Sequence, residues 1–248
     1  MGIVTYSKFE YYKEKIFSLS SPLEDGKMVS ESFLLETSED RNLSIYYAPV
    51  EYFNEHATVL IVGITPGINQ MKKAYASVLN NKDRLKNNEQ LLHEAKKASS
   101  YEGTMRKNLI HMLDELELQR YLGLSSSAEL FTAANHFVHT TGILPYPVFY
   151  KGKNFTGSTP AILKNKMLKR YVMECFVSNL SRLNNPLVIP LGVNVSNVLR
   201  HLLKSGLFNA THILTGFPHP SGANGHRHKQ FANHKERMRK EIADYFQK

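Results

Sequence analysis

The chain has 248 residues, 42% of them hydrophobic, and a formal net charge of +9. This apolar content supports a sizeable core and excludes a disordered chain, and the length fits one α/β domain. The positive charge favours an anionic partner, nucleic acid ahead of a membrane surface, although a basic protein without such a partner is the alternative. The single cysteine, Cys175, excludes an internal disulfide, a cysteine-ligated zinc and an iron–sulfur cluster.

No segment of the sequence suits a bilayer. The N-terminal residues contain no apolar signal core, and no run reaches the ~18 apolar residues that a membrane span needs. With one cysteine, this pattern predicts a cytoplasmic protein in a reducing compartment, without a membrane partner. We also expect a monomer.

Helical spacing of apolar residues recurs along the chain and indicates helices between apolar segments. One of these helices is rich in charge and is expected to be solvated, and Gly123 is expected to cap another. In chain order, the predicted helices cover residues 6–19, 80–97, 107–123, 161–183, 194–206 and 231–246.

Short apolar segments with many β-branched residues alternate with these helices and predict buried parallel strands. The pattern favours a three-layer α/β/α fold with a central four-stranded parallel sheet. We expect a single domain over residues 1–248, with residues 1–50 as a helical extension packed on it. The predicted strands are residues 58–64, 129–135, 186–192 and 211–217, with residues 42–50 as a further short strand or extended segment.

Ligands of such sheets bind beyond the carboxyl ends of the strands, so each segment that follows a strand is a candidate site. The first strand is followed by "GITPGINQ", in which Gly63 and Gly67 bracket Pro66. Such a turn allows close backbone approach, and the helix after it offers free amides to an anion. The alternative is an ordinary α/β turn.

Two other strand ends carry polar side chains. Asn135 ends the second predicted strand, where its amide could read a nucleobase edge or cap a turn. The fourth strand is followed by "HPSGANGHRHK", residues 219–229, which combines histidines and cations with no apolar residue larger than alanine. The third strand is followed by Gly192 and Asn194, which we interpret as a strand-to-helix turn with an N-cap.

These motifs resemble those of the uracil-DNA glycosylase superfamily. "VLIVGITPGINQ" is similar to its first motif, Gly-hydrophobic-Asn-Pro-Gly in the mismatch-specific and single-strand-selective branches, and "HPSGANGHR" is similar to its second, His-Pro-Ser. Between them, "SYEGTMRKNLIHMLDEL" and "LVIPLGVNVSNVL" resemble segments of the branch with four cysteines. The resemblance covers residues 58–231 in the family's order and implies the family's α/β fold.

The resemblance implies excision of uracil or another deaminated or damaged base from duplex or single-stranded DNA, by base flipping. His219 would stabilise the leaving base, and Ser221 would hold a phosphate. The first-motif residues Gly63, Ile64, Pro66 and Gly67 would line the base site. The loop that enters DNA would contain Pro220, Gly222, Asn224, His226, Arg227 and Lys229, with the basic run to Lys240 contacting phosphates.

An aromatic side chain stacks on the base in this family. Tyr101 matches through "YEG", and Tyr75 is the alternative by its distance from the first motif. Asn135 would read the base edge. The loop of residues 222–227 contains no large apolar side chain, so Asn224, His226 or Arg227 would have to fill the gap left by a flipped base.

The sequence departs from the family where a side chain positions the attacking water. Thr65 occupies the place of the usual asparagine, and a threonine hydroxyl is a poor general base at neutral pH. Asn69 is a second candidate for this role. The cluster cysteines are also missing, so we expect no cofactor and no metal.

Three hypotheses follow. The first is a DNA N-glycosylase with His219 and Thr65 at its centre. The second is a non-catalytic nucleic-acid-binding protein of the same fold that has lost the water-activating residue. The third is an unrelated α/β enzyme that binds a phosphate at residues 63–70, which would leave His-Pro-Ser without a role.

Overall fold

The computed structural model describes residues 7–85 and 87–247. They form two compact units, each built from several stretches of chain. The first unit contains Met1–Phe53, Pro66–Glu102 and Pro145–Phe155, and the second contains Asn54–Thr65, Gly103–Leu144 and Thr156–Lys248. The single domain expected over residues 1–248 stays a prediction.

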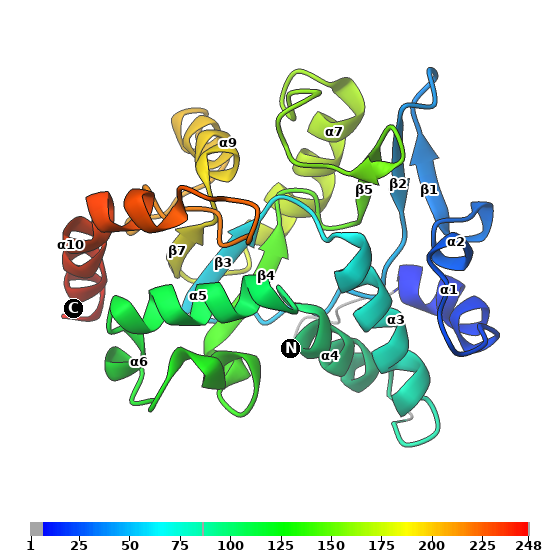
Figure 1. Ribbon diagram of the computed structural model, residues 1–248, viewed down its shortest axis with the longest axis horizontal. Helices are drawn as coiled ribbons and strands as arrows, with labels where there is room; N and C mark the ends of the chain where they lie inside the picture. Colours follow the sequence, from blue (N-terminus) through cyan, green and yellow to red (C-terminus); the bar gives the residue numbers. More distant parts are fainter. Residues whose placement is uncertain (1–6, 86, 248) are drawn as a thin grey trace. The chain divides into compact units, whose positions relative to one another are not determined.

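A parallel sheet forms the centre of the second unit. Its strands are β3 (Val59–Gly63), β4 (Val138–Gly142) and β7 (Leu187–Pro190), in the order β4-β3-β7 (Figure 1). Strands β3 and β7 are buried along their whole length, as their continuous apolar sequences predict. The mixed α/β class and the parallel sheet are therefore confirmed.

The predicted four-stranded sheet is wrong, because its fourth segment pairs at one point only. Ile213 forms an isolated parallel bridge with Val188 of β7. The amide of Val188 donates to His212 O at 3.0 Å, and the amide of Leu214 donates to Val188 O at 2.9 Å. The chain then turns at Gly216, which has φ +88°, so no regular strand continues from this bridge.

The second predicted strand is also wrong in position. Residues 129–131 end the 3-10 helix η2 (Ser127–Phe131), residues 132–134 form a turn, and Asn135 begins the 3-10 helix η3 (Asn135–Phe137). Strand β4 begins after η3. The carboxylate of Glu129 accepts the amide of Ser125 at 2.8 Å, and the hydroxyl of Ser126 accepts the amide of Ala128 at 3.1 Å. These local bonds favour a turn where apolar content alone suggested a strand.

The helices of the second unit follow the predicted pattern with shifted ends. The helix predicted at residues 107–123 divides where Glu117 adopts φ +62°. The helix predicted at residues 161–183 contains a π-helical turn, η4 (Val172–Val177). The elements are α5 (Thr104–Glu115), α6 (Leu118–Tyr121), α7 (Lys166–Tyr171), α8 (Ser178–Leu180), α9 (Val193–Lys204) and α10 (Arg227–Phe246).

The first unit combines helices with an antiparallel sheet of order β1-β2-β5-β6. Residues 1–50 therefore do not form a purely helical extension, since β1 and β2 lie within them. Figure 1 shows α3 and α4 side by side. The elements are α1 (Ser7–Phe17), α2 (Asp25–Met28), η1 (Glu31–Phe33), β1 (Leu34–Thr37), β2 (Leu43–Tyr46), α3 (Ile68–Asn81), α4 (Asn88–Ser99), β5 (Val148–Tyr150) and β6 (Lys153–Asn154).

The N-terminal part of the helix predicted at residues 80–97 is the end of α3 and a turn, and its remainder is α4. Across the described residues, no helix has both the length and the apolar character needed to cross a bilayer.

Candidate functional site

The carboxyl edge of the parallel sheet in the second unit collects the loops that follow its strands. The amide of Leu144, after β4, donates to Ile64 O, after β3, at 2.9 Å. The amide of Gly192, after β7, donates to Phe217 O at 3.0 Å. Because the strands are parallel, Thr65 and His219 emerge at this same edge, as predicted from their positions after strands.

His219 is half-buried in this edge, and its hydrogen bonding defines its tautomer. Its Nδ1 accepts the backbone amide of Ser221 at 3.3 Å, so in the neutral ring Nε2 carries the proton. Burial lowers the pKa of the His219 imidazole below its ordinary 6.5. The side chain is therefore a neutral hydrogen-bond donor at neutral pH.

The backbone around His219 is held from three directions. The side-chain amide of Asn108 on α5 donates to Pro220 O at 2.8 Å, and that of Asn224 donates to His219 O at 3.1 Å. A Cβ added to Gly192, which has φ +91°, would lie 3.0 Å from the Cβ of His219. The sequence gives no local signal for the role of Asn108, since its partner Pro220 lies 112 residues away.

The loop after His219 is organised by its own hydrogen bonds. The amide of Asn224 donates to Ser221 O at 3.0 Å, and its side chain donates to Gln230 Oε1 at 3.0 Å while accepting the amide of His226 at 3.3 Å. The hydroxyl of Ser221 accepts the amide of Ala223 at 3.1 Å. Asn224 is therefore a framework residue of this loop, while Gly222 and His226 are exposed.

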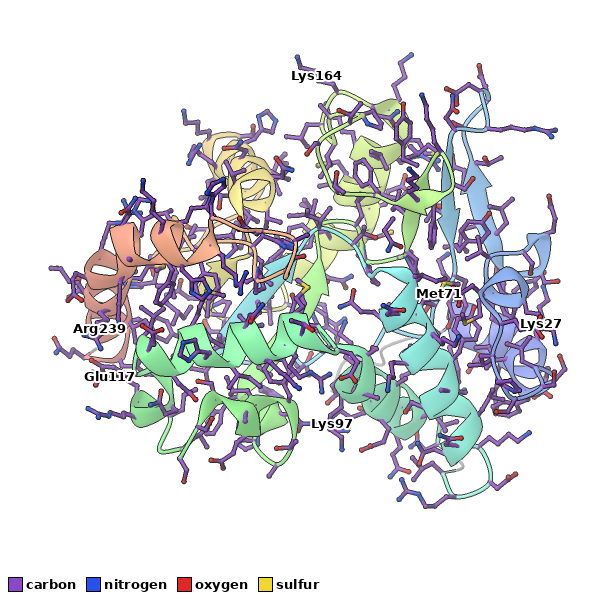
Figure 2. All side chains as sticks on the ribbon, viewed as in Figure 1. Lys27, Met71, Lys97, Glu117, Lys164 and Arg239 are labelled. Carbon is purple, nitrogen blue, oxygen red and sulfur yellow. The ribbon has the colours of Figure 1, made fainter. Side chains whose placement is uncertain are left out.

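Most cations of α10 contact protein groups. Lys235 forms an ion pair with Glu115 at 2.6 Å, and Arg237 donates to Thr215 O at 2.6 Å. Arg239, labelled in Figure 2, donates to Glu115 O from Nε at 3.2 Å and Nη2 at 3.0 Å. The predicted phosphate-binding run therefore also fastens α10 to its own unit.

The first turn of α10 differs from the rest of the helix. Lys229 is exposed there, and Arg227 donates from Nη1 to Asn224 O at 3.2 Å while its Nε is buried without a hydrogen-bond partner. The charges of this turn remain candidates for phosphate contact.

The first-motif loop crosses from the second unit to the first between Thr65 and Pro66. In the first unit, the amide of Gly67 donates to Gln70 Oε1 at 2.8 Å, and the amide of Ile68 donates to Asn154 Oδ1 at 3.0 Å. These two amides, predicted to be free to bind an anion, already have hydrogen-bond partners. Sequence spacing could not reveal Asn154, which lies 86 residues from Ile68.

Asn69 is exposed on α3, and Thr65 is half-buried. Their predicted water-positioning roles stay predictions.

The two candidate stacking tyrosines belong to the first unit. Tyr75 is completely buried, and its hydroxyl donates to Tyr47 O at 3.0 Å, so it is a core residue. Tyr101 is 6% exposed and adopts φ +53°, a strained conformation for a non-glycine residue. The predicted stacking role of Tyr101 stays a prediction.

Asn135 lies elsewhere than predicted. It begins η3, which precedes β4, so it stands at the amino end of that strand. His219 stands at the carboxyl edge of the same sheet. The predicted position of Asn135 at the carboxyl end of a strand is therefore wrong, because the strand follows Asn135.

Glu51 and Lys96 of the first unit both have pKa values shifted by their surroundings. The hydroxyls of Tyr47 and Tyr146 each donate to the Glu51 carboxylate at 3.0 Å, and Lys96 Nζ donates to Val50 O at 2.8 Å. Burial raises the pKa of Glu51 to about 7, although the tyrosines and lysines oppose it. Burial lowers the pKa of Lys96 to about 8.

Within residues 7–85 and 87–247, no group of three or more His, Cys, Asp or Glu side chains is arranged to hold a metal ion.

Comparison with known proteins identifies a relative of this chain. The chain is 38% identical over 245 residues to the uncharacterized protein YoxB of Bacillus subtilis strain 168, and the match covers 98% of this chain and 95% of that protein. The chain belongs to the YoxB family. No protein-family model matches the chain, and no solved structure matches it. Membership of the YoxB family therefore indicates common descent and gives no information about a reaction.

Proposed function

We propose that this protein is a DNA N-glycosylase that flips a nucleotide out of the helix and hydrolyses the bond between sugar and base. Its substrate would be uracil or another deaminated or damaged base, on the three-layer fold of the uracil-DNA glycosylase superfamily. The observation that carries the proposal is the neutral His219 imidazole, with its Nε2–H as donor, at the carboxyl edge of a parallel sheet. This edge is where ligands of such sheets bind.

The residue chemistry fits this reaction. When the N-glycosidic bond breaks, its electron pair leaves with the base, and negative charge builds on a base oxygen while the sugar becomes cationic. A donor already aimed at that oxygen stabilises the charge. Water then adds to the sugar carbon, and the proton it loses neutralises the departed base anion through the solvent. His219 suits the donor role because a neutral ring donates without first taking up a proton.

Thr65 is the proposed position for the water. It follows β3, whereas the His219 segment pairs beyond β7, so two strand spacings, roughly 10 Å, separate the two chain segments at the sheet edge. A nucleoside can bridge that span. Because a threonine hydroxyl orients a water without deprotonating it at neutral pH, we expect a slow enzyme.

A non-catalytic DNA-binding protein is the second candidate, and the first-motif loop favours it. This loop offers the Thr65 hydroxyl in place of an amide or carboxylate, and the amides of Gly67 and Ile68 already have partners. The same two amides argue against a small-molecule enzyme that binds phosphate there.

One experiment separates these candidates. The protein is incubated with single-stranded and duplex oligonucleotides that carry uracil, hypoxanthine or xanthine, and abasic sites are then cleaved with alkali. His219→Ala is compared with wild type. His56→Ala is the matched control, because His56 is 89% exposed and precedes β3 at the other end of the strand.

The proposal expects strand scission by wild type and by His56→Ala, and its loss in His219→Ala. DNA binding without scission of any base supports the non-catalytic candidate. Scission that survives in His219→Ala removes His219 from the mechanism, and absence of both binding and scission overturns both candidates.

A further inference from the structure

Val193 is an apolar side chain that the fold leaves in solvent. It is 70% exposed, although it is the first residue of the amphipathic helix α9. The core-facing stripe of this helix consists of Val195, Val198, Leu199 and Leu202, all buried. Helical periodicity of 100° per residue turns Val193 about 200° away from Val195, so packing does not account for a valine at this position.

Both chain neighbours of Val193 are held in place, and the preceding one contacts His219. The preceding residue, Gly192, adopts φ +91°, donates its amide to Phe217 O and packs against the backbone of His219. On the other side, the side chain of Asn194 donates to Thr156 O at 3.3 Å and to Ser158 Oγ at 3.0 Å. The chain is therefore anchored immediately before and after Val193.

A flipped nucleotide leaves a gap in the base stack, and DNA-bending proteins commonly fill such gaps with an apolar side chain. The loop of residues 222–226 lacks one, since Ala223 is its largest apolar residue, and Asn224 is engaged within the loop. Among the described residues, the other exposed large apolar side chains are Tyr11 in the first unit, Tyr121, which stacks on Phe246, and Leu207, which follows the C-terminal end of α9.

We infer that Val193 inserts into duplex DNA beside the flipped nucleotide and holds the gap open. This inference rests on the proposed glycosylase function, and it assigns the insertion to the loop after β7 instead of the loop after His219. The side chain of Val193 then matters for a base-stacked duplex and not for a single strand, because a single strand has no gap to fill.

The test compares Val193→Ala with Leu207→Ala. Val193 is the first residue of α9 and Leu207 follows its C-terminal end, so the two side chains lie at opposite ends of the helix. Both side chains are exposed. Base excision is measured on a duplex and on the corresponding single strand, and flipping is followed by the fluorescence of 2-aminopurine next to the target base. Val193→Leu tests whether a larger apolar side chain preserves the function.

We expect Val193→Ala to reduce duplex excision and the 2-aminopurine signal by about tenfold, which corresponds to two methyl groups lost from an apolar contact. Single-strand excision, Leu207→Ala and Val193→Leu are expected to stay near wild type. Equal losses on both substrates, or no loss on the duplex, overturn the role of Val193 while the glycosylase stands. Wild-type activity on single strands alone has the same consequence. A wild type that neither flips nor excises any base overturns both proposals.

Discussion

The half-buried carboxyl of Glu51 leads to a prediction about pH and stability. Its pKa rises from 4.5 to about 7 in the folded state because of burial, despite hydrogen bonds from Tyr47 and Tyr146. A group whose pKa is raised on folding stabilises the protein fully below its unfolded pKa, and this contribution is lost as the pH rises through the folded value. For Glu51 the window runs from pH 4.5 to about 7.

The magnitude follows from the shift. One pKa unit corresponds to 1.36 kcal/mol, so a rise from 4.5 to about 7 corresponds to about 3 kcal/mol. Glu51→Gln keeps the shape of the side chain but cannot ionise. Near pH 4.5 wild-type Glu51 is mostly neutral, so the difference between the proteins there reports the isosteric change. The further difference at pH 7.5 reports the buried charge.

Lys96 reduces the stability that Glu51→Gln gains over wild type at pH 7.5. Desolvation lowers the pKa of Lys96 to about 8 in the folded state, and the negative charge of Glu51 opposes this by raising it. In Glu51→Gln the half-buried ammonium of Lys96 loses that stabilising charge. The contribution of Lys96 to the free energy of unfolding depends on pH in the opposite direction to that of Glu51. It is present above pH 10.5 and is lost as the pH falls towards 8. We therefore treat about 3 kcal/mol as the upper limit of the gain from Glu51→Gln at pH 7.5.

The assay is urea denaturation of wild type, Glu51→Gln and Glu10→Gln at pH 4.5 and 7.5. Glu10 is an exposed carboxylate on α1 and serves as the control. The free energy of unfolding of Glu51→Gln should gain on wild type as the pH rises, and that of Glu10→Gln should not. Parallel pH profiles for wild type and Glu51→Gln would refute the reasoning that burial of Glu51 raises its pKa.

Two further predictions concern the second unit. Gly192→Ala introduces a Cβ at φ +91° that meets His219 at 3.0 Å, and should lower stability by about 1–3 kcal/mol and disturb the His219 loop. Gly206→Ala has a similar φ of +67° with open space around it, so thermal melts and amide exchange of the two variants separate backbone strain from close approach. If DNA binds, Lys229→Ala should reduce the slope of log affinity against log salt by about 1. Lys235→Ala should change the slope less, because Lys235 is paired with Glu115, and equal effects would refute this division of the α10 cations.

The parallel strands show which parts of the fold could be predicted from the sequence. Strand β3 was predicted because five successive residues are apolar or glycine and are buried on both faces. Strand β4 was missed because its sequence, Val-His-Thr-Thr-Gly, is largely polar and nevertheless mostly buried. The antiparallel sheet of the first unit was also missed, since β2 pairs with β5 about a hundred residues away and local pattern contains no record of partners.

The candidate site divides in the same way. The sequence by itself determined that His219 follows an apolar segment and Thr65 follows a strand, because burial and strand order leave a local signature in residue types. Only the tertiary structure decided that Ser221 selects the tautomer of His219, that Asn154 occupies the amide of Ile68, and that Asn135 precedes its strand. These outcomes depend on which polar groups come within hydrogen-bonding distance when the chain folds. Contacts between segments that are distant in the sequence determine this.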